Sequence, residues 1–142
     1  MDFDNPSREE IERRLGTVKT LAVIGLSDNP LRTSYAVSAA MQRWGYRIVP
    51  VNPGIRGALG EPAHPTLSAA VATLGPRTPI DLVNVFRRPA HVAEIVDECI
   101  RLGLPALWLQ EGVVDAAAAQ RARAAGLFVV MGRCIMKDRA RM

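Results

Sequence analysis

The chain has few of the residues that would mark it as secreted, membrane-spanning or held together by disulfides. Among its 142 residues only Cys99 and Cys134 are cysteines. A disulfide framework is therefore not expected, and the cytoplasm is the default compartment. The longest apolar runs have the length of a strand, far below the roughly 20 residues of a membrane-spanning helix. No basic segment followed by an apolar one opens the sequence, so we expect neither a signal peptide nor a membrane partner.

Aromatic residues and lysine are also scarce. Phe, Trp and Tyr together number seven, too few for the stacking platforms that bind single-stranded nucleic acid. No recognition-helix signature is present either, so we expect no nucleic-acid partner. Arginine accounts for 16 of the 18 basic residues, and the formal net charge is +4. Guanidinium groups suit phosphates and a positive field favours a polyanionic ligand, although a GC-rich genome is an alternative source of arginine.

What the chain does contain is five short apolar runs that alternate with helix-like segments. This alternation predicts an α/β fold with a parallel sheet covered by helices on both faces, that is, a three-layer, Rossmann-like, doubly wound sheet. The length suits a single domain over residues 1–142. Right-handed crossovers favour the strand order 3-2-1-4-5, counted along the chain. The predicted strands are 20–24, 46–51, 81–86, 106–109 and 127–131.

Capping residues and glycines predict where the helices between these strands begin and end. A capping box at Ser7 and Glu10 opens a helix over 7–15, and Trp44 lies on the apolar face of a helix over 34–44. Residues 1–6 are expected to fray, 57–65 to form a loop, and 132–142 to lack a regular pattern. The other predicted helices are 67–74, capped by Thr66, a helix from Pro89 to Gly103, and a helix from Asp115 to Gly126.

The first strand is followed by the kind of turn and helix start that binds pyrophosphate. The strand stops at Gly25, where a missing side chain lets backbone approach a phosphate. Ser27, Thr33 and Ser34 offer hydroxyls, and Arg32 offers a charge-assisted contact. The dinucleotide fingerprint G-x-G-x-x-G is incomplete, because its second and third positions hold serine and proline. An ordinary strand-to-helix turn fits this segment equally well.

Ligands of such sheets bind beyond the carboxyl ends of the strands, at a switch point that the predicted order places between the first and fourth strands. Asn52 and Pro53 follow the second strand, and no acid is present until Glu61. An NAD site needs Asp or Glu there to hold the ribose, so NAD is disfavoured. Asn52 could bond a ribose or a base, and Pro53 could simply form a turn.

The remaining polar residues at this edge include no evident catalytic group. Arg87 and Arg88 follow the third strand, and one of them could meet a phosphate. Glu111 follows the fourth strand as a lone carboxylate, without the histidine or second acid that acid–base catalysis would use. The two histidines and two cysteines match no metal spacing. Cys99 belongs to an apolar helix face, whereas Cys134 lies near Arg133 and Lys137 and is the thiol expected to react.

Five segments in this order are IGLSDNPLRTSYAV, GYRIVPVNP, DLVNVFRRP, LWLQEGVV and GLFVVMGRC. They resemble the small stand-alone CoA-binding proteins, and the domain is similar to the CoA-binding part of the succinyl-CoA synthetase α subunit. The resemblance covers about residues 7–142. It implies non-catalytic binding of CoA or an acyl-CoA as a small-molecule ligand, with a protein partner or a homo-oligomer left open. The alternative is an NAD(P)-binding oxidoreductase or nucleotide sensor, with Arg32 or Arg56 on a 2′-phosphate.

The resemblance also implies a role for each turn at the sheet edge. By position, Gly25, Leu26, Ser27, Arg32, Thr33 and Ser34 would hold the pyrophosphate; Asn52, Pro53, Val85, Phe86 and Arg87 would flank the adenosine; and Gln110, Glu111 and Gly112 would lie along the pantetheine.

Overall fold

Five parallel strands form the central sheet of the computed structural model, which describes residues 2–142. All five strands are almost entirely buried, which agrees with their continuous apolar sequences and with helices on both faces. In spatial order they are β2 (Arg47–Val51), β1 (Thr20–Ile24), β5 (Leu82–Val85), β6 (Ala106–Leu109) and β7 (Phe128–Met131). The predicted α/β, doubly wound fold is confirmed.

The predicted strand order is wrong at one point. The prediction placed β5 outside β2, whereas β5 lies between β1 and β6, so the order along the chain is 2-1-3-4-5. One reason is Pro50 in β2, since proline has no N–H for a further strand and belongs at sheet edges. The outer edge of β2 instead meets the chain at His64, whose N–H donates to the Pro50 carbonyl at 3.0 Å. The switch point consequently lies between β1 and β5.

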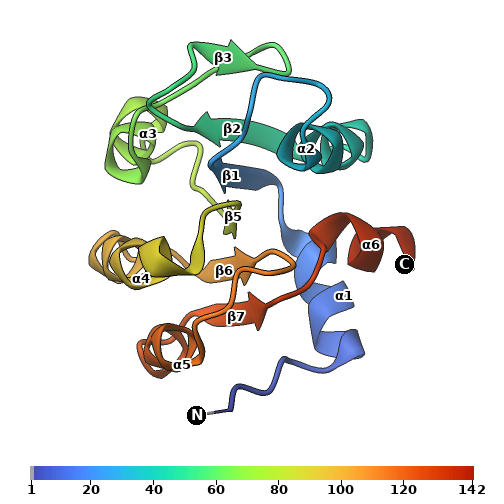
Figure 1. Cartoon of the computed structure of the whole chain (residues 1–142), viewed down its shortest axis with the longest axis vertical. Coiled ribbons are helices and arrows are strands. Elements are labelled where there is room, and N and C mark those ends of the chain that lie inside the picture. Colours follow the sequence, from blue (N-terminus) through green and yellow to red (C-terminus); the bar gives the residue numbers. More distant parts are fainter. Residues whose placement is uncertain (1) are drawn as a thin grey trace.

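Within residues 2–142, six α-helices form the two outer layers (Figure 1). On one face lie α3 (Leu67–Leu74), α4 (Val92–Arg101) and α5 (Ala116–Ala124); on the other lie α1 (Arg8–Thr17), α2 (Thr33–Arg43) and α6 (Ile135–Ala140). A 3-10 turn, η1 (Pro89–His91), leads into α4. Each face of the sheet thus has its own apolar core.

Three predicted helix starts carry the capping bonds that the sequence indicates. The side chains of Ser7, Thr66 and Asp115 accept from the backbone N–H three residues later, at 3.0–3.2 Å. Trp108 is fully buried, but Trp44 is 39% exposed, so its placement in the core was wrong. Trp44 follows the last residue of α2, and its ring faces the Arg139 guanidinium at 5.2 Å.

Three segments have more structure than the sequence predicted. Residues 57–62 contain a small hairpin of β3 (Gly57–Ala58) and β4 (Glu61–Pro62), and the C-terminal segment forms α6. Of the segment expected to fray, residue 1 lies outside the described residues, and residues 2–6 are held in place because the Asn5 side chain bonds both the N–H and the carbonyl of Met131. This contact covers the open edge of β7, the kind of edge that folded proteins protect. No helix within residues 2–142 is long and apolar enough to cross a membrane.

Candidate functional site

The turns that follow the strands are connected to one another at the carboxyl edge of the sheet. The Gly25 N–H donates to the Val51 carbonyl at 2.9 Å, and the Gln110 N–H reaches the Val85 carbonyl at 3.3 Å. Parallel strands place all their carboxyl ends at one edge, so the predicted site residues do share this edge. They differ in which of their groups remain available to a ligand.

Gly25 is required by the packing of the turn itself. Its φ is +83°, and a Cβ at this position would lie 2.3 Å from the Phe86 carbonyl oxygen. The close approach that Gly25 allows is therefore first of all an approach to the chain's own backbone after β5. The missing side chain of Gly25 thus lets the two turns of the switch point pack against each other.

The loop between β1 and α2 is shaped by its own hydroxyl and amide side chains. The Ser34 hydroxyl accepts from the Ser27 N–H, and the Ser27 hydroxyl accepts from the Asn29 N–H, both at 3.0 Å. Leu26 is fully buried in the core, so only its backbone is available. Ser27 and Ser34 thus maintain the shape of the loop with the hydroxyls that were predicted to bind phosphate.

The loop is exposed from Asp28 to Arg32, and its last exposed residue stands at the N-terminus of α2. Arg32 is the N-cap residue of the helix, but its side chain makes no capping bond. Arg32 and Thr33 are both exposed, and the first turn contains no acidic residue. A helix N-terminus with a cation beside it and no acid in its first turn favours an anion.

Asn52 connects the turns after β1 and β2. Its Nδ2 donates to the Leu26 carbonyl at 3.0 Å, and its Oδ1 accepts from the Gly54 N–H at 2.8 Å. Both ends of the amide are therefore engaged within the protein. Pro53, the next residue, is exposed.

A hollow of about 210 Å³ lies at the switch point, on the side of α3 and α4. Three predicted site residues, Gly25, Pro53 and Arg87, line it together with His91. We call it the switch-point hollow. Two other predicted residues, Val85 at the end of β5 and Phe86 after it, do not line the hollow. Val85 is buried in one core, and Phe86 packs against the core on the other face of the sheet. Its full lining is Ile24, Gly25, Val51, Pro53, Pro65, Thr66, Leu67, Arg87, His91, Glu94, Ile95 and Glu98.

The turn after β6 divides into a buried and an exposed part. Gln110 is only 4% exposed, and its Nε2 donates to the buried Oδ1 of Asn84 at 2.7 Å. Glu111 and Gly112 are exposed, and the Glu111 carboxylate pairs with Lys137 of α6 at 3.1 Å. Sequence reasoning missed this pairing, since it treated Glu111 as a lone acid.

Neither cysteine is an accessible thiol. Cys99 is fully buried, as predicted, and burial together with the Glu98 charge raises its pKa to about 12. Cys134 is 6% exposed, so the expectation of a reactive group was wrong. The neighbouring cations are engaged elsewhere, Arg133 with Asp138 and Lys137 with Glu111. Within residues 2–142 no three His, Cys, Asp or Glu side chains are grouped to hold a metal ion.

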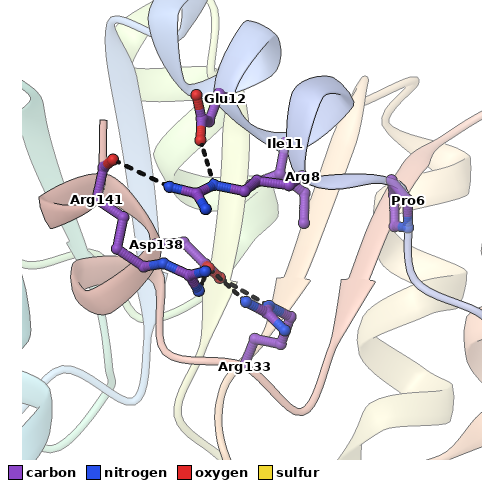
Figure 2. Close-up of a pocket in the computed structure, with 7 residues that line it drawn as sticks. All are labelled: Pro6, Arg8, Ile11, Glu12, Arg133, Asp138 and Arg141. Atoms are coloured by element: carbon purple, nitrogen blue, oxygen red, sulfur yellow. Dashed lines mark hydrogen bonds and ion pairs between the residues drawn. The ribbon is translucent and has the colours of Figure 1, made fainter.

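Two further hollows lie away from the predicted residues. One, of about 230 Å³ between α1 and α6, is lined by arginines that are paired with carboxylates (Figure 2). There Arg8 pairs with Glu12, and Arg133 and Arg141 pair with Asp138, whose hydrogen bond raises the pKa of Arg133. The other, of about 620 Å³, is mainly apolar and lies at the amino edge, where Ile80 and Leu104 precede β5 and β6.

Comparisons with known proteins give a family for this chain and agree with its fold. Residues 19–140 match the sequence model of a CoA binding domain. The chain is 44% identical over 133 residues to the uncharacterized protein YneT of Bacillus subtilis (strain 168), covering 94% of each chain. A hypothetical protein from Pyrococcus horikoshii OT3 superposes with a TM-score of 0.85 at 29% identity, over 99% of this chain and 98% of that one. The apo dinucleotide-forming acetyl-coenzyme A synthetase 1 of Ca. Korarchaeum cryptofilum shares the fold, with a TM-score of 0.66 at 18% identity, over 83% of this chain and 27% of that one.

Proposed function

Because the chain belongs to the CoA binding domain family, we propose that it binds CoA or an acyl-CoA at the carboxyl edge of its sheet, without catalysing a reaction. We also propose that it does so in the cytoplasm, the compartment that suits its two free cysteines.

One observation supports the location of the ligand more than any other. The N-terminus of α2 is exposed, has no side-chain cap and no acid in its first turn, and stands beside the switch point with Arg32 at its start. An anion at a helix N-terminus gains about 0.3–1 kcal/mol, and more where it is partly buried. The pyrophosphate of CoA is such an anion, and the backbone of Gly25, Leu26 and Ser27 lies next to this helix end.

The other exposed groups at the edge suit the remaining parts of the ligand. Pro53 and Arg87 in the switch-point hollow would contact the adenosine end. Glu111 and Gly112, exposed after β6, would lie along the pantetheine arm. The carboxylate of Glu111 is paired with Lys137 and has no histidine beside it, which fits binding better than catalysis.

An NAD(P) ligand is the alternative, and the end of β2 argues against it. The residue there is Asn52 rather than an acid, and both ends of its amide already bond the backbone. A ribose diol would therefore lack the carboxylate that dinucleotide folds provide. NADP would need Arg32 or Arg56 to meet its 2′-phosphate instead.

A thermal-shift panel of CoA, acetyl-CoA, NAD, NADP and ATP tests the ligand. A ligand at 100 times its dissociation constant adds about 2.7 kcal/mol of stability. At about 2–4 °C per kcal/mol, the melting temperature would rise by several degrees. We expect CoA or acetyl-CoA to give the largest rise, and a larger rise with NAD or NADP at equal concentration would refute the proposal.

Two arginines of α2 make a matched test of the pyrophosphate position. Arg32→Ala removes a cation at the helix start and Arg43→Ala removes one in its last turn. Calorimetry should show about a tenfold or greater loss of CoA affinity for Arg32→Ala, as expected for a charge-assisted bond. Arg43→Ala should bind as the unmodified protein does. Equal affinities of the two variants would place the pyrophosphate elsewhere.

A further inference from the structure

The imidazole of His91 bonds the guanidinium of Arg87, and the carboxylate of Glu94 bonds that imidazole in turn. Arg87 Nη2 lies 3.1 Å from His91 Nε2, and His91 Nδ1 lies 3.1 Å from Glu94 Oε1. A guanidinium can only donate hydrogen bonds, so Nε2 must accept and the ring proton resides on Nδ1, where it donates to Glu94. Each of the three groups therefore has one defined role in the chain Glu94–His91–Arg87.

This chain of bonds is at the wall of the switch-point hollow. Arg87, His91 and Glu94 all line it, together with Gly25 and Pro53. The stem of Arg87 rests on the turn after β1, since its Cδ would lie 3.2 Å from a Cβ on Gly25. With the stem on that turn and the guanidinium bonded to His91, the side chain has little freedom to leave the hollow.

The negative charges near Arg87 are already engaged. Glu98, which also lines the hollow, accepts from the N–H and the hydroxyl of Ser68 at 3.1 and 2.7 Å and lies 3.8 Å from Arg101. Glu94 accepts from His91. Among the residues that line the hollow in the described part of the chain, Arg87 is the one arginine or lysine.

We propose that His91, supported by Glu94, is a positioning residue that aims Arg87 at the 3′-phosphate on the ribose of CoA; this inference rests on the proposed function. In nucleotide-binding sheets the ribose lies at the end of the second strand, and Pro53, which follows β2, borders the same hollow. A phosphate monoester offers several oxygens to the planar guanidinium fork. Arg87 then binds the 3′-phosphate, the group that CoA has and dephospho-CoA lacks.

The two ligands, measured side by side, separate this role from a general effect on the fold. Calorimetry is run with CoA and with dephospho-CoA on the unmodified protein and on Arg87→Ala, His91→Ala, His91→Gln and Arg88→Ala. Arg88 is the adjacent exposed arginine, so its variant makes the same charge change outside the hollow. In His91→Gln the amide oxygen can accept from Arg87 while its NH₂ donates to Glu94, which keeps the arrangement.

We expect Arg87→Ala to lose about 10-fold to 100-fold in CoA affinity and almost nothing for dephospho-CoA, as for a charge-assisted bond. His91→Ala should lose about threefold to tenfold for CoA alone, because Arg87 must then be ordered on binding. His91→Gln should restore most of that loss, and Arg88→Ala should match the unmodified protein.

Two results overturn the inference, and they differ from a failure of the proposed function. If CoA binds but Arg87→Ala weakens both ligands equally, Arg87 does not read the 3′-phosphate. If His91→Ala and His91→Gln behave alike, His91 does not position Arg87. If the unmodified protein binds neither ligand, the proposed function itself is wrong, and this inference falls with it.

Discussion

The side-chain Nδ2 of Asn52 donates to the backbone carbonyl of Leu26 at 3.0 Å, so one amide joins the turn after β1 to the turn after β2. The same amide accepts from the Gly54 N–H through its Oδ1. A residue at the expected ribose position thus uses its side chain to hold the turns after β1 and β2 together. Its contribution to ligand binding should be indirect, through the position of the Gly25 turn.

Asn52→Ala should lower the free energy of unfolding by about 1–3 kcal/mol, because the Leu26 carbonyl and the Gly54 N–H both lose their partner. Urea denaturation measures the loss. Asn29→Ala is the control, since the Asn29 side chain bonds only the nearby N–H of Leu31 in an exposed loop. Equal losses for the two variants would mean that the bond between the turns contributes nothing.

Gly25→Ala should cost more stability than glycine replacement elsewhere at a similar backbone angle. Gly60, with φ +78°, has no atom within 4 Å of the place that a Cβ would take, whereas at Gly25 the Phe86 carbonyl oxygen would lie at 2.3 Å. Gly60→Ala should therefore show the cost of the positive φ alone, about 1–2 kcal/mol. Denaturant midpoints of the two variants give the comparison, and a Gly25→Ala loss no larger than that of Gly60→Ala contradicts the packing role.

Local patterns were sufficient to predict the five strands of the central sheet and the helices α1 to α5, because caps and stops act within a few residues. Ser7, Thr66 and Asp115 make their bonds three residues away, whatever the rest of the chain does. Strand order depends on contacts between distant segments, and right-handed crossovers permit more than one order. The one local indication of the strand order was Pro50, whose missing N–H marks β2 as an edge strand. The β3–β4 hairpin has two residues in each strand, too few for a periodic pattern.

The candidate site could be placed at an edge from sequence, but the availability of each side chain could not. Residues that follow parallel strands necessarily meet at the carboxyl edge. Whether such a side chain faces a ligand depends on tertiary packing: Leu26 and Val85 point into the two cores, and Gln110 bonds Asn84. The contacts of Lys137 with Glu111 and of His91 with Arg87 are likewise made only in the folded chain.

Asp138→Asn should destabilise the protein by loosening α6 from the turn after β7. The Asp138 carboxylate is 9% exposed and accepts from Arg133 Nε at 2.8 Å, and it also lies near Arg141 (Figure 2). We expect a loss of about 1–2 kcal/mol, below the 3–5 kcal/mol of a fully buried pair, because Arg133 is partly exposed.

The control for Asp138→Asn is Asp97→Asn, which breaks the exposed pair of Asp97 with Arg121. An exposed pair contributes about 0–1 kcal/mol, so this variant should unfold almost as the unmodified protein does. Thermal denaturation at low and at high salt measures both. Equal melting temperatures for the two variants would show that the ion pairs of Asp138 with Arg133 and Arg141 do not stabilise the fold.

The buried thiol of Cys99 should make the protein less stable at alkaline pH. Burial and the Glu98 charge raise its pKa to about 12, from an ordinary value of 9.0. Below pH 9 the thiol is neutral in both the folded and the unfolded chain, so its contribution is fully present. Between about pH 9 and pH 12 only the unfolded chain ionises, and the free energy of unfolding falls by up to about 1.4 kcal/mol per pH unit.

Other groups titrate in the same pH range, so the effect of Cys99 is measured as a difference between the unmodified protein and Cys99→Ala. Urea denaturation at pH 8, 9 and 10 should show that the stability advantage of the unmodified protein shrinks as pH rises. Cys134→Ala serves as the matched thiol control. The difference between its free energy of unfolding and that of the unmodified protein at pH 8, 9 and 10 shows what the second buried cysteine contributes. An advantage of Cys99 that stays constant from pH 8 to pH 10 would mean that its thiol ionises as readily in the folded chain as in the unfolded one.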